Sequence, residues 1–143
     1  MKKALFYRWF GVGKFPAIYT TELFAEGILI SDEGLSGSTT YRNFHRPGSY
    51  SSIRKVGLVA SVVLTNKRIA AFSGENPLIN VPFTDERLRR IAFSVEPNGA
   101  LLAAFDASLF HSDWSGQIEY RFRTEKAQEI VDRLATLIPK TSI

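Results

Sequence analysis

The sequence predicts a mainly β fold of the α+β class, in which about seven antiparallel strands are followed by a C-terminal amphipathic helix that caps them. From Glu22 onward, short strand-like segments alternate with turn residues. Residues 117–123 alternate between polar and apolar side chains, and the residues after Thr124 change to helical spacing. A chain of 143 residues, 45% of them hydrophobic, suits one domain. We assign it to residues 21–140, after an N-terminal arm at residues 1–20.

Short groups of turn residues separate the predicted strands. Asp32-Glu33-Gly34 ends the first strand, Arg46-Pro47-Gly48-Ser49 marks a loop, and Asn98-Gly99 favours the positive φ of a hairpin. The run VGLVASVVLT, residues 56–65, is the most β-like part of the chain and predicts a central strand. The predicted strands are 27–31, 35–44, 56–65, 68–72, 79–83, 91–95, 100–105 and 117–123.

The last predicted element is an amphipathic helix. Thr124 is placed to cap its N-terminus, and Glu125 in the first turn interacts favourably with the helix dipole. Pro139 ends the helix, because the residue before a proline is disfavoured in helical geometry. The apolar stripe consists of Ala127, Ile130, Val131, Leu134 and Ile138. We therefore expect the helix to dock on an open face or end of the strands.

Composition excludes several classes of function. The chain has no cysteine, which excludes disulfide scaffolds, thiol catalysis and zinc sites built on thiolates. No apolar run approaches the roughly 20 residues of a transmembrane helix. His111-Ser112-Asp113 brings three catalytic residue types together, but neighbours in a strand or turn point in different directions. We predict a protein that is not an enzyme and that binds no metal or cofactor.

The charges are unevenly distributed along the chain. The first 21 residues contain four basic residues and no acidic one, which accounts for the net charge of +4. Residues 34–74 contain six basic residues and no acid, whereas residues 91–120 contain four acids and no Lys or Arg. If these two stretches fold onto different faces, one face suits anionic partners.

The N-terminal arm mixes aromatic and basic side chains. Its apolar part is only about five residues long before Arg8 interrupts it, so it does not fit a signal peptide. Phe6, Arg8, Trp9 and Phe10 suit a membrane interface, where aromatic rings lie at headgroup depth and cations meet anionic lipids. We favour the alternative, in which the arm packs its rings on the domain.

The hairpin VLTNKRIAAF, residues 63–72, and the strand IEYRF, residues 118–122, point to a known fold. In their sequence and in their position before a final helix, they resemble the pleckstrin-homology-like superfold, in particular bacterial PH-like and GRAM-like domains. The resemblance implies a bent, partly closed antiparallel barrel of two sheets plugged by the helix, with Arg68 in its framework. Phosphoinositide-binding members use basic residues in the first hairpin loop, whereas Ser31-Asp32-Glu33-Gly34, which we take as the equivalent loop, is acidic.

A candidate binding site lies later in the chain, around the loop after residue 45. Five residues that flank or form this loop suit a phosphate or an acidic peptide: Arg42, His45, Arg46, Arg54 and Lys55. Nucleic acid is a weaker candidate, because the acidic stretch would repel a wrapped polyanion. We expect a non-enzymatic interaction module that binds a protein partner or assembles with itself. The alternative is binding to anionic lipid through the arm and the basic face. The expected location is the cytoplasm, with a peripheral position at the membrane under that alternative.

Overall fold

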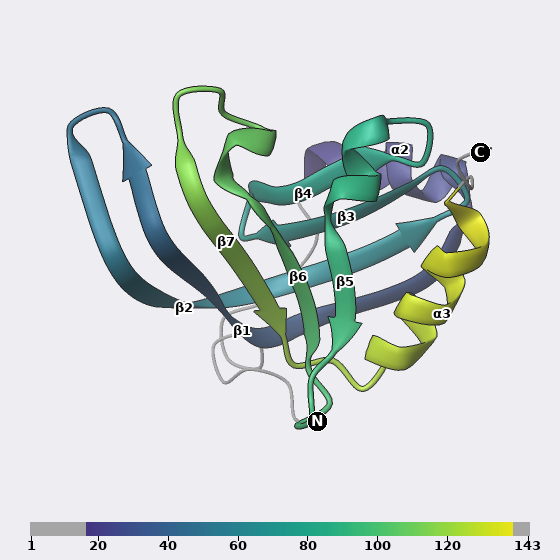
Figure 1. Ribbon diagram of the computed structural model, residues 1–143. Helices are drawn as coiled ribbons and strands as arrows, with labels where there is room; N and C mark the ends of the chain where they lie inside the picture. Colours follow the sequence, from purple (N-terminus) through teal and green to yellow (C-terminus); the bar gives the residue numbers. More distant parts are fainter. Residues whose placement is uncertain (1–16, 139–143) are drawn as a thin grey trace.

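A computed structural model describes residues 17–138 of the chain (Figure 1). These residues form seven strands, two α-helices and two short 3-10 helices. In chain order they are α2 (Ala17–Glu26), β1 (Ile28–Arg46), β2 (Ser49–Thr65), β3 (Arg68–Ser73), β4 (Asn76–Pro82), η1 (Glu86–Arg90), β5 (Ala92–Val95), β6 (Leu101–Asp106), η2 (Ala107–Leu109), β7 (Ser115–Phe122) and α3 (Ala127–Leu137). The predicted mainly β fold with a C-terminal helix is confirmed.

The seven strands of residues 17–138 form one antiparallel sheet, not the two sheets that the resemblance implies, because β1 pairs with both β2 and β7 and so joins the two halves. The strand order is β4-β3-β2-β1-β7-β6-β5. The sheet curls into a half-barrel, with β3 and β4 at one end of the strand order and β5 and β6 at the other (Figure 1). Strand β1 is at the centre, because it pairs with β2 along one edge and with β7 along the other. Helix α3 lies next to β5, at one end of the half-barrel (Figure 1).

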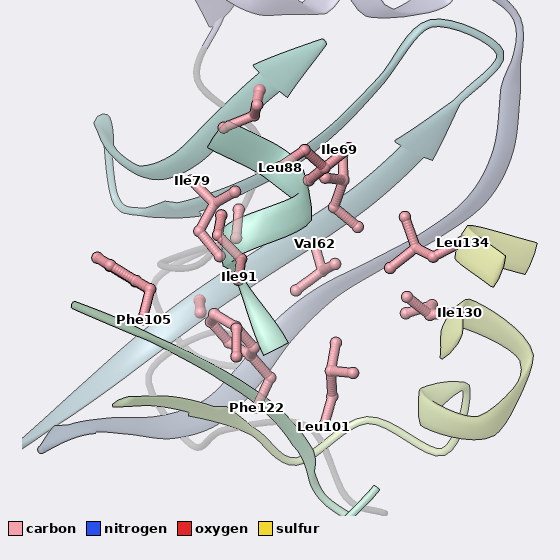
Figure 2. Packing of buried hydrophobic residues seen from close by; sticks show 14 of the residues in the cluster. Val62, Ile69, Ile79, Leu88, Ile91, Leu101, Phe105, Phe122, Ile130 and Leu134 are labelled. Carbon is pink, nitrogen blue, oxygen red and sulfur yellow. The ribbon is translucent and has the colours of Figure 1, made fainter. Parts of the chain in front are cut away.

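The concave side of the sheet holds the main hydrophobic core (Figure 2). Strands from both ends of the sheet contribute side chains to this core, so hydrophobic contacts hold the two ends together. Ten of its buried side chains are Val62, Ile69, Ile79, Leu88, Ile91, Leu101, Phe105, Phe122, Ile130 and Leu134. Each large aliphatic side chain contributes roughly 1.5–3 kcal/mol by its burial. Because Ile130 and Leu134 belong to α3, the predicted docking of the apolar stripe is confirmed.

Helix α2 covers a second, smaller cluster on the convex side of the sheet. Leu23 is buried there together with Val63 and Phe72, and the ring of Tyr19 lies 5.1 Å from that of Phe72. The prediction of strands directly from Glu22 misses this helix, which also runs through the predicted domain boundary at residue 20. The segment AIYTTELFAE was hard to recognise because it lacks the single apolar stripe of an amphipathic helix.

Two predicted boundaries in the first hairpin are wrong. The residues Asp32-Glu33-Gly34 do not end a strand, because β1 continues through them to Arg46. They form a bulge between Asp32 and Leu35, where Gly34 has a φ of 68°. A glycine with positive φ accommodates the extra residue of a bulge as readily as it accommodates a turn. Strand β2 begins at Ser49, not at residue 56, so the first hairpin turn is Pro47-Gly48.

The start of α3 also differs from its prediction. The Thr124 hydroxyl accepts a hydrogen bond from the Lys126 backbone N–H at 3.1 Å and donates one to Asp32 Oδ2 at 2.7 Å. Thr124 therefore caps a turn that precedes the helix, and the helix itself begins at Ala127. The contact with Asp32 fixes this junction to the β1 bulge. Neither helix within residues 17–138 has the length and apolar character needed to cross a membrane.

Candidate functional site

The outer half of β2 is an open sheet edge. Strand β2 pairs with β1 over its whole length, from Ser49 to Thr65, but with β3 only from Ala60 to Leu64. Within residues 17–138, no strand pairs with the other side of residues 49–59. We call these eleven residues the free edge. Figure 1 shows this part of the hairpin extending beyond the curled sheet.

Large apolar side chains are exposed on the free edge. Tyr50, Ile53 and Val56 are 56%, 63% and 39% exposed. The outer strands β4 and β5 differ from the free edge in ways that disfavour strand addition. Strand β4 contains Pro77 and Pro82, which lack the N–H donor of a sheet ladder, and β5 is only four residues long and lies against α3. Of the described sheet edges, the free edge is therefore the one best suited to accept another strand.

The five residues predicted to form a binding site all lie on this hairpin, but they do not form a single cluster. Arg54 lies opposite Tyr41, and Lys55 lies opposite Thr40 in the β1–β2 ladder. Because successive side chains of a strand point to opposite faces, Arg54 and Lys55 are on different faces. Arg54 lies on the side of the core, and Lys55 lines a groove of about 490 Å³ on the convex side with Arg121 and other residues.

Arg42 belongs to an ion-pair network. Its Nε donates to Glu119 Oε2 at 2.9 Å, and Arg121 contacts Glu119 and, at 2.9 Å, Glu96. Burial opposes ionisation of Glu119, but the hydrogen bonds from Arg42 and Arg121 outweigh it and lower the pKa of this carboxyl. The basic and acidic stretches of the sequence therefore meet at the β1–β7 junction and do not form separate faces there.

His45 and Arg46 lie near the end of β1. The His45 ring is 4.3 Å from the ring of Tyr50, and its Nδ1 is 3.2 Å from the carbonyl oxygen of Asn43. Arg46 and Arg54 line the same small cavity, of about 50 Å³, beside Trp114. These two arginines are the predicted cations that the structure brings together on the core side of the hairpin.

A larger cavity, of about 310 Å³, lies beside this small one on the concave side of the half-barrel. We call it the aromatic cavity. The aromatic side chains that line it come from β1, β6, β7 and the segment between β6 and β7: Tyr41, Phe105, Phe110, His111, Trp114 and Tyr120. Burial, with a smaller contribution from Tyr41, raises the pKa of Tyr120 to about 12. Its hydroxyl is therefore protonated at neutral pH.

The aromatic cavity and the free edge escape the sequence analysis. The residues of the cavity are spread from Tyr41 to Tyr120, and nothing in their spacing shows that they meet. Ile53 was the available signal for the free edge, because it is an isolated large apolar residue among serines and cations.

Other expected sites have different outcomes. Phe6, Arg8, Trp9 and Phe10 lie outside the described residues. His111 stacks on Trp114, with ring centroids 3.6 Å apart. Within residues 17–138, no three His, Asp or Glu side chains are grouped so as to hold a metal ion.

Comparison with protein-family models finds no match for the chain. Comparison with curated proteins finds no match either. The free edge, the two neighbouring arginines and the aromatic cavity are thus the features from which a function is argued.

Proposed function

We propose that this chain is a non-enzymatic protein-interaction module that binds an extended segment of a partner protein along the free edge. The observation that supports this most directly is that, within residues 17–138, residues 49–59 of β2 pair with β1 on one side only and expose three large apolar side chains. Unpaired N–H and C=O groups on an edge strand are a template for another strand. In such complexes the main-chain hydrogen bonds supply affinity, and alternate side chains supply specificity.

Charge favours an acidic segment over a second copy of this chain. Arg46, Arg54 and Lys55 have no salt bridge to a carboxylate among the described residues. Arg54 is at the middle of the free edge. An antiparallel pair of two free edges would bring the two Arg54 side chains close together, and like charges in facing positions destabilise strand pairing. A segment with Asp or Glu would gain from the same cations.

The fold supports a PH-like assignment as part of this proposal. Seven antiparallel strands in a curled sheet lead directly from β7 into a C-terminal helix that packs on the core. Arg68, which the resemblance assigns to the framework, is held by Glu26 and by Asn80 Oδ1 at 3.0 Å. The fold alone does not select a ligand, because one fold serves many functions.

The test uses two synthetic eight-residue peptides, one alternating Val and Glu and the other alternating Val and Lys. We expect the Glu peptide to shift the NMR signals of residues 49–59 and to slow hydrogen exchange of their amides. The Lys peptide, and a Glu peptide N-methylated at alternate residues, should have no such effect. Equal effects from all three peptides, or none from the Glu peptide, would contradict the proposal.

A matched pair of variants tests where the peptide binds. Ile53→Lys places a charge on the free edge and should abolish binding of the Glu peptide. Phe24→Lys changes a side chain that is similarly exposed, at 66%, on helix α2, and should leave binding unchanged. The sedimentation mass of the wild-type chain gives a separate check. If the wild-type chain is a stable dimer and Ile53→Lys dissociates it, the free edge binds a second copy of the chain and not an acidic segment.

Binding to anionic lipid is a second candidate, and one observation favours it. The first hairpin turn is Pro47-Gly48, so the loop used by phosphoinositide-binding members of the PH-like superfold would correspond here to this turn, which follows His45 and Arg46, and not to the acidic bulge. Sedimentation with vesicles of 20% phosphatidylserine tests this candidate. If the wild-type protein sediments with the vesicles and the double variant Arg46→Ser, Arg54→Ser does not, the result would support lipid binding. If the wild-type protein does not sediment, lipid binding is excluded for these vesicles.

A further inference from the structure

We infer that the aromatic cavity is an anchor site for the segment bound at the free edge. The group that it holds is an aromatic ring of that segment, with an acidic group beside the ring. The assignment of the ring to a bound segment rests on the proposed function. The preference of the cavity for a ring beside an acid has independent support from the residues that line the cavity and from the neighbouring cations.

The size and lining of the cavity suit a single ring. Its volume of about 310 Å³ is at the lower end of the range for ligand sites, roughly 300–1,000 Å³. Leu78 and Ile79 of β4 also line the cavity and add aliphatic surface to its aromatic side chains. A cavity of this size can take one aromatic ring but is too small for a large ligand.

The aromatic walls are held in place by contacts with one another. Trp114 meets Phe44 edge to face at 5.3 Å, and Phe105 meets Phe110 in the same way at 5.5 Å. Such edge-to-face pairs are favourable beyond the area that they bury. A guest ring can make the same offset or edge contacts with Tyr41 and Trp114 without reordering them.

The acidic group is inferred from the small cavity beside the aromatic one. Tyr41 and Trp114 line both cavities, so the two sites share a wall. Arg46 and Arg54 line the smaller of the two cavities. A ring and a carboxylate on one short ligand can therefore occupy the two sites together, with the carboxylate accepting charge-assisted hydrogen bonds from arginine.

Arg87 lines the aromatic cavity itself, but it is already paired with a carboxylate. Arg87 lies over the Phe110 ring at 5.0 Å, and its Nε is 3.1 Å from both carboxylate oxygens of Asp85. The hydrogen bonds from Arg87 lower the pKa of Asp85, so this carboxylate stays ionised. The charge of Arg87 is thus neutralised locally, which leaves Arg46 and Arg54 as the cations for an acidic ligand.

The free edge and the cavity are on the same side of the hairpin. Arg54 belongs to the free edge and lies opposite Tyr41, a wall of the aromatic cavity. A strand added along β2 directs alternate side chains toward that side. One of these side chains is in position to supply the ring, and a neighbouring acid of the same segment meets the arginines.

The experiment titrates 3-phenylpropionate into the ¹⁵N-labelled protein and compares it with the uncharged 3-phenylpropanamide. We expect the indole N–H signal of Trp114 and the amides of Tyr41 and Phe105 to shift, with tighter binding of the carboxylate than of the amide. Arg54→Ser should weaken carboxylate binding about two- to fivefold, as for loss of an exposed ion pair. The matched control is Arg123→Ser, because Arg123 is also exposed but lies on the convex side, so this variant should leave carboxylate binding unchanged.

A second variant tests the cavity itself. Leu78→Trp fills it from the β4 side and should abolish binding of both compounds, while the Glu and Val peptide still binds the free edge. No shift at Trp114 with millimolar 3-phenylpropionate, or equal binding of acid and amide, would overturn the inference and leave the proposed function intact. Binding of 3-phenylpropionate without binding of the Glu peptide would retain the ring-and-acid site and overturn the proposed function.

Discussion

The contact between α2 and the sheet allows the sharpest prediction about stability. Arg68 Nε donates to both carboxylate oxygens of Glu26, at 3.0 and 2.9 Å, and its Nη1 donates to Asn80 Oδ1. The side chains of Arg68 and Glu26 are 14% and 10% exposed, so this ion pair is largely removed from water. Glu22 also contacts Arg68, but its side chain is 57% exposed.

Removal of one partner should be costly, because the other charge remains partly buried. Arg68→Met should lower the free energy of unfolding by about 3–5 kcal/mol. Glu26→Gln should lower it by about 2–4 kcal/mol, since Glu22 still faces Arg68. The double variant should cost far less than the sum of the two, with a coupling free energy of about 2 kcal/mol or more. Urea unfolding of the four proteins measures all three quantities.

The pH dependence supplies an independent readout of the same contact. The hydrogen bond from Arg68 lowers the pKa of Glu26 below its ordinary value of 4.5, against the opposing effect of burial. The stabilisation is therefore complete above pH 4.5 and is lost as the pH falls through the lowered pKa. Glu26→Gln should remove this acid dependence. Arg87→Gln is the control, because the Arg87–Asp85 pair is exposed and should be worth less than about 1 kcal/mol.

Two results would refute this account of the α2 contact. One is a cost below about 1 kcal/mol for each single variant, which would class the pair with ordinary surface salt bridges. The other is strict additivity in the double variant, which would show that Arg68 and Glu26 act separately. Either result would leave Leu23 and its apolar neighbours as the main attachment of the helix.

Three further predictions concern other parts of the fold. Leu134→Ala should destabilise the protein by about 2–5 kcal/mol in urea unfolding, because this side chain is buried against the core, whereas the exposed Glu129→Ala should cost well under 1 kcal/mol. The folded state holds the Tyr120 proton more tightly than the unfolded state, so the free energy of unfolding should decline between pH 10 and 12 as this proton is lost. The raised pKa corresponds to a decline of about 2–3 kcal/mol. Tyr120→Phe should remove that part of the decline. Gly116→Ala should lower the melting temperature, because the φ of Gly116 is 103° and a Cβ would lie 2.4 Å from the backbone oxygen of Asn43. Gly57→Ala is the control and should have little effect, because a Cβ at Gly57 would meet no atom within 4 Å.

The elements that the sequence predicts well are those with a regular local pattern. The stripe at Ala127, Ile130 and Leu134 identifies α3, because one face of an isolated helix must be buried whatever covers it. The central part of β2 is found for a similar reason, since its apolar run suits only a strand covered on both faces. In both cases the information lies within about ten residues.

The features that the sequence does not predict depend on which strands become neighbours. The free edge exists because β3 pairs with β2 only from Ala60 onward, and apart from the isolated apolar Ile53 nothing in residues 49–59 marks that departure. The aromatic cavity likewise requires Tyr41 and Tyr120 to share the concave side, which follows only from the β1–β7 pairing. The pattern Asp32-Glu33-Gly34 does not distinguish a hairpin turn from a bulge, because the same residues suit both.

The central position of β1 has a consequence for the order in which the chain folds during synthesis. Strands β1 to β4 pair with their neighbours in the sequence, so this meander can form early. The second edge of β1 must wait for β7, since Thr40 pairs with Glu119. Closure of so long a loop is slow, and pairings distant in sequence dominate the folding rate. A nascent chain therefore carries two open edges on its longest hairpin until residue 122 has left the ribosome, and unpaired strand edges are prone to aggregation in that interval.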